Sequence, residues 1–462
     1  MKRIQVQFIH FILFAAFFAS CNIIRHYQQP AVDNGNLYRD VTTSDTTSIG
    51  NLNYREIFSD TILQALIAEG ISRNLDLQIA YTRIRQAEAY YQQSRLAFLP
   101  TLNGNASIGV ARIAKTQAGI AGASSPQLQL GLSTGWEADI WGRLGSTRRA
   151  NFAALLENEA YSRVVKTNLV AGIANYYYTL LSLDQQLIIT QQTVELRRTT
   201  LETIKALKEG AIVTGAAVVQ SEANLYAAQV TIPDLQQNIR ETENALSILL
   251  ARPPAPVVRD SLYSQQPFGS LQTGVPAQLL HNRPDVQQAE FAFRNAFELT
   301  NVAYTNFYPS LNITGSGGMA GAGFKNFFNT GAFFGNIAAG LTQPIFNRGL
   351  NRTQLIVGQS NQQAALLSFQ NIILTAGQEV SNALFLHQAA IDKMNIRVNQ
   401  LGALQKSVEY TQELLKYGFA NYTEVLTAQQ SLLSAELSGI DDKLQQLQAI
   451  VNLYRALGGG WR

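Results

Sequence analysis

The sequence contains little cysteine and little charge. Cys21 is the single cysteine among 462 residues, which excludes an intrachain disulfide framework and any cysteine-based metal site. Charged residues make up 15% of the chain, well below the roughly 25% of a typical soluble domain. The net charge is only +3, so the basic footprint of a nucleic-acid binder is missing. Hydrophobic residues reach 46%, which excludes a disordered chain.

Long apolar runs are also missing. The run from Phe8 to Phe18 is too short for the roughly 20 apolar residues of a membrane-spanning helix. It follows Met1-Lys2-Arg3 and is typical of a secretory signal peptide, which we predict over residues 1–20. No other stretch approaches a spanning length, so we expect no transmembrane helix in the mature chain.

Cys21 follows Ala19-Ser20, in a pattern that resembles a bacterial lipobox. This pattern predicts a covalent lipid on Cys21 and a lipidated N-terminal linker over residues 21–60. Apart from this lipid, we expect no cofactor. An incidental cysteine beside an ordinary cleavage site is the alternative interpretation. The next residue is Asn22 rather than the aspartate associated with inner-membrane retention, which indicates the outer membrane.

Catalytic and metal-binding motifs are absent from the sequence. The four histidines share no ligand spacing, so we expect no metal site; they are His10, His26, His281 and His387. No G-x-S-x-G or phosphate-binding glycine motif occurs. We therefore expect a protein that is not an enzyme.

An internal repeat organises the chain. Phe98-Leu-Pro100 recurs as Phe307-Tyr-Pro309, an offset of 309 − 100 = 209. Two later matches keep nearly the same spacing and order: Trp141-Gly142-Arg143 with Phe346-Asn347-Arg348, and Leu207-Lys-Glu-Gly210 with Leu415-Lys416-Tyr417-Gly418. Prolines cluster between the copies, which is typical of a linker. The chain therefore contains two copies of one structural unit.

Each copy begins with a helix, over residues 72–99 and 284–307, that a proline ends. Two strands with alternating apolar and polar residues follow. In residues 127–140, Leu128, Leu130, Leu132, Trp136 and Ile140 share one face, and the fourth strand has Ile337, Ala339, Leu341 and Ile345. Strands of about ten residues with this alternation suit a transmembrane β-barrel.

Proline then disappears from residues 144–209 and from residue 349 to the end. These stretches predict helices of about 100 Å at 1.5 Å per residue. Apolar heptad positions support them: Ile173, Leu180, Leu187, Val194 and Leu201, and Leu426, Leu433, Ile440, Leu447 and Tyr454. Gly210 and Gly418 mark the turns into returning helices.

The predicted domains follow from this order. The first repeat, residues 61–251, has strands at about 101–114 and 127–140 and long helices at about 144–209 and 215–251. An equatorial linker spans residues 252–283. The second repeat, residues 284–462, has strands at about 310–323 and 336–346 and long helices at about 349–417 and 422–457.

Four membrane strands cannot close a barrel, because about eight is the smallest closed number and an open edge in hydrocarbon leaves backbone groups unpaired. Two chains would give eight strands with a filled interior, and three would give twelve strands around a water channel. The long helices would extend that lumen into the periplasm. The predicted fold is therefore an α+β membrane protein with a β section in the membrane and an α section in the periplasm.

Three motifs resemble the outer membrane factor family, the TolC-like exit ducts, and in particular its NodT-like lipoprotein subgroup, which serves resistance-nodulation-division efflux pumps. The first runs from Val275 to Glu290 and includes Arg283-Pro284-Asp285. The others are Trp136-Glu-Ala-Asp-Ile-Trp141-Gly142-Arg143 and Gln343-Pro-Ile-Phe-Asn-Arg348-Gly349. Apart from this resemblance, Pro284 and Asp285 are a typical helix start.

The resemblance implies a homotrimer with a twelve-stranded transmembrane β-barrel, continued by a long α-helical periplasmic barrel. It implies passive conduction of small molecules, with three partners: a periplasmic membrane-fusion adaptor, an inner-membrane resistance-nodulation-division transporter and outer-membrane lipid. A type I secretion duct and a trimeric adhesin are the alternatives. Strands in both halves, each followed by a long helical excursion, favour the duct.

The resemblance also places a periplasmic gate around Gly418, where the family carries carboxylates six and nine residues after the glycine. Glu424 matches the sixth position, whereas Thr427 departs from the pattern at the ninth. Three copies of Glu424 would form a cation-attracting ring, and pairing with Lys416 would offset the mutual repulsion of the three carboxylates. The alternative is a solvated Glu424, with the constriction among Lys416, Tyr417, Phe419 and Thr427.

Overall fold

The computed structural model describes residues 23–31, 37–39, 46–112, 124–269, 273–274 and 282–462. The predicted signal peptide and Cys21 lie outside these residues. The chain divides into two compact units. The first comprises residues up to Ala31, Arg83–Asn158 and Gln288–Phe369, and the second comprises Val32–Thr82, Glu159–Gln287 and Gln370–Arg462.

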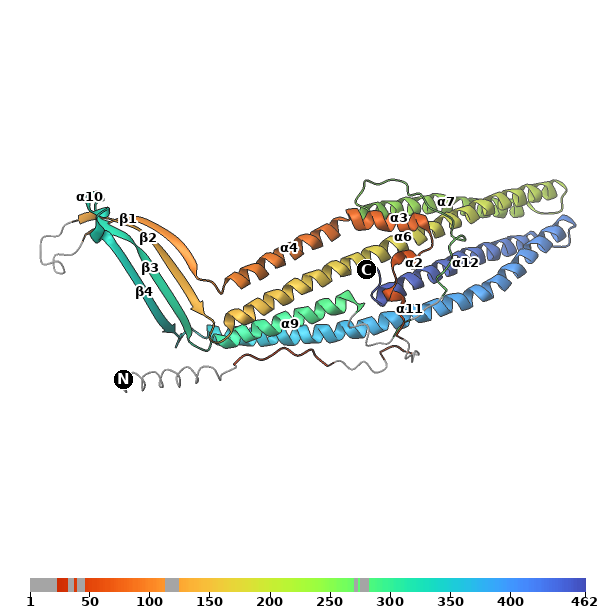
Figure 1. The fold of residues 1–462 in the computed structure, drawn as a ribbon. Helices are drawn as coiled ribbons and strands as arrows, with labels where there is room; N and C mark the ends of the chain where they lie inside the picture. The colour runs from red at the N-terminus through yellow and green to blue at the C-terminus, as the bar shows by residue number, and fades with distance from the viewer. Residues whose placement is uncertain (1–22, 32–36, 40–45, 113–123, 270–272, 275–281) are drawn as a thin grey trace. The chain divides into compact units, whose positions relative to one another are not determined.

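A four-stranded antiparallel sheet lies in the first unit, in the order β1-β2-β3-β4 (Figure 1). Its strands are β1 (Thr101–Arg112), β2 (Ser124–Ala138), β3 (Ser310–Ala322) and β4 (Phe333–Thr342). Ala106 pairs with Leu130, Leu130 with Met319 and Met319 with Phe333. Each repeat therefore supplies two neighbouring strands, and β2 and β3 join the repeats.

Two strands end earlier than the sequence predicts. β2 stops at Ala138, because Asp139 leaves the strand to accept hydrogen bonds from the backbone N–H groups of Leu144 and Gly145, both at 2.8 Å. β4 ends at Thr342, shortly before Pro344, which has no N–H group to donate. Ile140 and Ile345 therefore lie outside the strands to which the alternation assigned them.

Four long helices follow the sheet strands. They form two matched pairs: α6 (Arg143–Glu209) and α11 (Leu350–Lys416) have 67 residues each, and α7 (Gly215–Leu249) and α12 (Tyr422–Ala456) have 35 each. The heptad prediction for α6 is confirmed at Ile173, Leu180, Val194 and Leu201, which are buried. Among the described residues, no helix combines the length and apolar character needed to cross a bilayer.

Shorter elements complete the fold. They are η1 (Ile49–Asn51), α2 (Tyr54–Ile57), α3 (Thr61–Arg73), α4 (Leu75–Leu96), α9 (Pro284–Thr305), α10 (Phe324–Phe327) and η3 (Thr330–Ala332). The single helix predicted over residues 72–99 is wrong at its start, because α3 ends at Arg73 and a new helix begins at Leu75. Asn74 separates them: its side-chain oxygen accepts from the N–H of Leu77 at 2.9 Å.

A single constant spacing in residue number relates equivalent positions in the long helices of the two repeats, whereas the spacings between the sequence motifs vary. Left-handed backbone conformations occur at Gly142 and Gly349, at Ala211 and Gly418, and at Ala251 and Gly458. Each pair is separated by 207 residues (349 − 142 = 207), as are the starts and ends of all four helices. The matches of Arg143 with Arg348 (348 − 143 = 205) and of Gly210 with Gly418 (418 − 210 = 208) are therefore wrong by one or two residues, and Arg143 is not the structural equivalent of Arg348.

Candidate functional site

The sheet of the first unit is amphipathic. One face carries polar side chains from all four strands: Asn103, Asn105, Ser107, Gln127, Gln129, Ser133, Asn312, Thr314, Ser316 and Asn336. The opposite face carries Leu102, Ile108, Leu130, Leu132, Ile313, Ile337 and Leu341. Ile337 is 86% exposed in the single chain. An apolar face this open suits a hydrocarbon neighbour, and the opposite face suits water.

Both outer strands of this sheet are open. Among the described residues, β1 pairs only with β2, and β4 pairs only with β3. Each therefore has one edge of backbone N–H and C=O groups without a strand partner. Beside an apolar face, such edges require pairing with further strands.

The predicted motif at Trp141, Gly142 and Arg143 builds the junction between β2 and α6. The Trp141 indole N–H donates to the carbonyl of Pro309 at 2.8 Å. Gly142 has a φ of 73°, and a Cβ atom there would lie 2.0 Å from the side chain of Ile24. Arg143 bonds Glu137 at 2.8 Å, and this hydrogen bond raises the pKa of the guanidinium although burial opposes it. These residues have a structural role.

The motif that contains Arg283-Pro284-Asp285 is centred on Arg283, a buried arginine of the second unit. Its guanidinium bonds both carboxylate oxygens of Asp285, at 3.0 and 2.6 Å, and the Glu379 carboxylate of α11 at 2.8 Å. It also donates to the carbonyl of Ala456 in the last turn of α12, at 2.8 Å. Burial alone would lower the pKa of Arg283, but the two carboxylates outweigh burial and raise it.

Pro284 and Asp285 take the positions that the sequence predicts for a helix start. Pro284 is the first residue of α9, and the Asp285 carboxylate lies in its first turn. Glu290, further along α9, contacts the N-terminal segment of the first unit: it accepts from the Tyr27 hydroxyl at 3.4 Å and from the Gln29 amide at 3.1 Å. The signature residues therefore fix α9 rather than perform chemistry.

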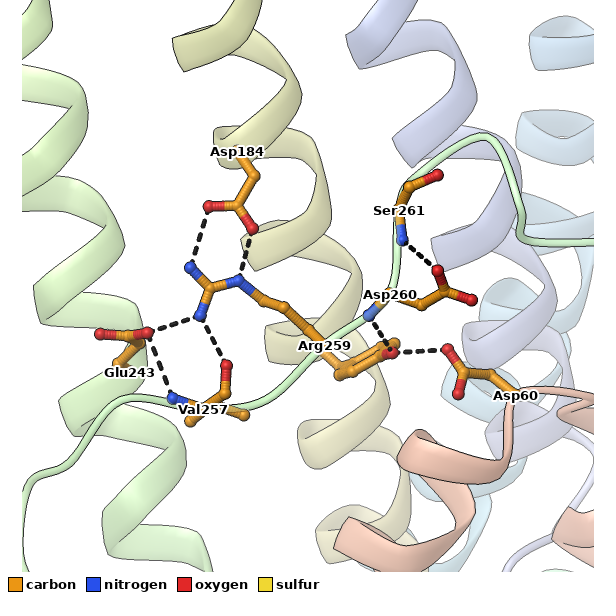
Figure 2. A network of polar contacts seen from close by, with 8 residues as sticks. Asp60, Asp184, Glu243, Val257, Arg259, Asp260 and Ser261 are labelled. Atoms are coloured by element: carbon orange, nitrogen blue, oxygen red, sulfur yellow. Dashed lines mark hydrogen bonds and ion pairs between the residues drawn. The ribbon is translucent and has the colours of Figure 1, made fainter.

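Sequence reasoning missed a polar network around Arg259 in the linker (Figure 2). Its guanidinium forms ion pairs with Asp184 of α6 and Glu243 of α7 and donates to the Val257 carbonyl at 2.9 Å. The hydrogen bond to Asp184 raises the pKa of Arg259 against the effect of burial. Arg259 and Asp260 are the only charged residues between Pro253 and His281, and this isolation was the available signal.

The helix tips of the second unit differ from the prediction in one respect. Gly418 has the expected left-handed backbone, with a φ of 76°, and Phe419 N–H bonds the Leu414 carbonyl at 2.9 Å. In the first repeat the left-handed residue is Ala211, with a φ of 57°, and not Gly210. Ile212 N–H makes the equivalent bond to Leu207 at 2.9 Å. Packing under both turns therefore imposes on an alanine a backbone that costs about 1 kcal/mol.

This difference predicts opposite effects of two substitutions. Ala211→Gly should stabilise its turn by about 1 kcal/mol, and Gly418→Ala should destabilise its turn by about 1 kcal/mol. A Cβ atom at Gly418 would meet no other atom within 4 Å, so only the backbone conformation is tested. Hydrogen exchange of tip peptides would measure both effects. Equal exchange in wild type and both variants would contradict the assignment.

The predicted gate residues lie around the second tip. Lys416, Tyr417, Glu424 and Thr427 are exposed in the single chain. Glu424 is the third residue of α12, within its first turn. The Thr427 hydroxyl donates to the Thr423 carbonyl at 2.7 Å.

The expected ion pair between Glu424 and Lys416 does not form within the single chain. The ion pairs among the described residues do not join Lys416 to Glu424. A carboxylate in the first turn of α12 also interacts favourably with the helix dipole. Beneath the tips, Ile204, Ala217, Leu415 and Val425 form a buried apolar cluster that joins the helices of both repeats.

No group of three or more His, Cys, Asp or Glu side chains in the described part of the chain is arranged to hold a metal ion. The described residues do form an amphipathic sheet with two open edges and two pairs of long helices. These are the parts of a membrane duct wall.

Comparison with known proteins identifies the class. The sequence profile of the family described as "Outer membrane efflux protein" matches residues 66–252 and 275–459. These two segments correspond to the two structural repeats. The chain therefore belongs to the outer membrane efflux protein family, and it is an outer-membrane protein.

Individual relatives cover nearly the whole chain. The cation efflux system protein CusC of Escherichia coli O6:H1 is 28% identical over 454 residues, with 96% of each chain covered. The solvent efflux pump outer membrane protein SrpC of Pseudomonas putida is 28% identical over 450 residues, again with 96% of each covered.

Solved structures show the same fold. The open state of the MtrE outer membrane channel of Neisseria gonorrhoeae matches with a TM-score of 0.84 and 25% identity, covering 96% of this chain and 99% of that one. The outer-membrane channel OprN matches with a TM-score of 0.85 and 22% identity, covering 96% and 100%. The predicted fold class, with two repeats of sheet strands and long helices, is confirmed.

Proposed function

We propose that this protein is the exit duct of a tripartite efflux pump, which conducts small molecules passively from a periplasmic adaptor and an inner-membrane transporter to the exterior. The observation that carries the proposal is the amphipathic four-stranded sheet with two open edges. Its polar face lines a water-filled lumen and its apolar face contacts lipid. The efflux-pump relatives CusC and SrpC support this role.

The open edges of β1 and β4 support a homotrimer. Three chains supply twelve strands, and pairing of β1 with β4 of the next chain closes the barrel without an unpaired edge. Twelve strands leave a lumen, whereas the eight strands of a dimer would fill theirs with side chains. The paired helices α6, α7, α11 and α12 continue the same lumen into the periplasm.

Conductance and mass together test this function. The purified protein should have the mass of three chains in detergent and should conduct ions in planar lipid bilayers. A folded monomer or dimer would contradict the closure argument. A trimer that never conducts, even with the adaptor and transporter present, would contradict the duct.

A lipid on Cys21 completes the proposed membrane attachment. The lipobox-like sequence Ala19-Ser20-Cys21 supports this lipid. Mass spectrometry of the mature protein should find an acylated N-terminal Cys21. Cys21→Ala should remove the lipid and leave the trimer intact, because the barrel supplies its own insertion energy. An unmodified Cys21, with cleavage at another bond, would contradict this prediction.

We propose that three copies of Glu424, one from each chain, form an acidic ring at the periplasmic gate. Glu424→Gln should preserve the trimer and lower the cation preference of the channel, because three carboxylates at one level attract cations. Single-channel recordings of reversal potential in a salt gradient measure this preference. Unchanged selectivity and closed-state conductance would show that Glu424 is solvated, and the constriction would then lie among Lys416, Tyr417, Phe419 and Thr427.

A further inference from the structure

A polar pocket of about 330 Å³ lies near the tips of the second unit, between helices α6, α7 and α12. It is lined by one charged side chain and by neutral side chains, most of which can form hydrogen bonds. The lining residues are Arg197, Gln220, Asn224, Thr423, Leu426, Thr427, Gln430 and Ser431. The lining contains a single formal charge, which is positive, and no carboxylate. The pocket is therefore suited to an anion.

Arg197 of α6 is the charge in this pocket and is only 5% exposed. Its guanidinium donates to the Asn224 carbonyl of α7 at 2.6 Å and to the Gln430 side-chain oxygen of α12 at 2.7 Å. Both acceptors are neutral. A guanidinium has five N–H donors, so these two contacts leave donors available for a ligand.

Two other arginines of this unit, the buried Arg283 and the half-buried Arg259, are paired differently. Arg283 contacts the carboxylates of Asp285 and Glu379, and Arg259 contacts those of Asp184 and Glu243. No ion pair to Arg197 occurs among the described residues. Burial accordingly lowers the pKa of Arg197, whereas carboxylates raise the pKa of Arg283 and Arg259. A buried cation without an anion is costly.

We propose that the Arg197 pocket binds a carboxylate group that comes from outside the trimer. One carboxylate group places a single negative charge beside the single positive charge of the pocket, whereas one phosphate group would place up to two there. Its two oxygens accept several hydrogen bonds, and the planar guanidinium is the preferred partner for that geometry. The hydroxyls of Thr423 and Ser431 and the amide of Gln220 supply further donors. This inference rests on the proposed trimer only in that the carboxylate belongs to none of its three chains.

Ligand-observed NMR on the detergent-solubilised trimer tests the pocket, with glutarate as the probe and the neutral diamide glutaramide as its control. Saturation transfer should reach glutarate and not glutaramide. Arg197→Met should reduce the glutarate signal at least tenfold. Arg198→Gln is the matched control, because the neighbouring Arg198 is exposed and paired with Glu195 at 2.6 Å. An absent signal, or an equal loss in both variants, would overturn the proposal.

A second variant keeps the test valid if Arg197→Met fails to fold. Ser431→Glu introduces a carboxylate into the same pocket and retains Arg197. It should abolish glutarate binding and raise the melting temperature, because the internal carboxylate takes the place of the ligand. Continued glutarate binding by Ser431→Glu would overturn the proposal.

The carboxylate has two sources, which a binding measurement distinguishes. If it is an acidic side chain of the adaptor, Arg197→Met should weaken adaptor binding to the immobilised trimer about tenfold, and glutarate should compete. If it is a free carboxylate, adaptor binding should be unchanged while glutarate binding is lost. The NMR experiment needs no adaptor, transporter or conductance. A failure of the pocket proposal would therefore appear in the NMR measurement, and a failure of the exit-duct proposal would appear in the conductance measurement.

Discussion

Replacing Arg283 with methionine should accelerate hydrogen exchange at the start of α9 and the end of α12 about a hundredfold. The substitution leaves the Asp285 carboxylate without its cation, leaves Glu379 with only the more exposed Arg455, and leaves the Ala456 carbonyl without its donor. Removal of one partner from a buried ion pair costs about 3 kcal/mol. The free energy of local opening, measured by hydrogen exchange, should fall by this amount.

Arg455→Met is the matched control. Arg455 contacts the same Glu379 carboxylate at 3.3 Å, but its side chain is 35% exposed. Solvent screens such a pair, so the expected loss is below about 1 kcal/mol. Similar effects of the two substitutions would show that Arg283 contributes no more than a surface charge.

Arg259→Met should release the linker from the helices. Asp184 and Glu243 would lose their common cation, and the Val257 carbonyl would lose its donor. We expect a loss of about 3 kcal/mol in the local stability of the linker, because all of these contacts converge on one half-buried guanidinium. Limited proteolysis of the folded trimer should then cut within residues 253–269, where the wild type should resist cleavage.

The same linker provides a control for this prediction. Arg252 contacts Glu69 at 3.4 Å and has no second carboxylate partner among the described ion pairs. Arg252→Met should therefore leave the cleavage rate within about threefold of wild type. Resistance of Arg259→Met to proteolysis would show that other contacts hold the linker in place.

Much of the fold could be predicted from local patterns. Alternation of apolar and polar residues in β1 and β2 identifies strands because side-chain direction has a period of two. The absence of proline from residues 144–209 and 349–462 permits two uninterrupted helices, and the heptads provide their packing faces. Element ends were less accurate, because they depend on individual side-chain hydrogen bonds. Asp139 ends β2 by accepting from the N–H groups of Leu144 and Gly145, and Asn74 starts α4 by accepting from the N–H of Leu77.

The equivalence of the repeats shows where sequence matching fails. The motifs paired Gly210 with Gly418, but the backbone pairs Ala211 with Gly418. A glycine is the residue expected at a left-handed position, so a sequence comparison aligns the glycines. The apolar cluster beneath the tips fixes the turns instead, and it contains residues from all four long helices.

The sequence by itself determined the two repeats, the amphipathic strands, the long helices and the membership of an outer-membrane duct family, because each follows from residues close together in the chain or from motif order. Only the tertiary structure decided which charges meet. Arg259 and Asp184 are 75 residues apart, Arg283 and Glu379 are 96 apart, and Arg197 and Gln430 are 233 apart. Such contacts depend on how helices from both repeats pack, and no local pattern records that packing. The tertiary structure therefore distinguishes two arginines held by carboxylates from Arg197, which has none among the described residues.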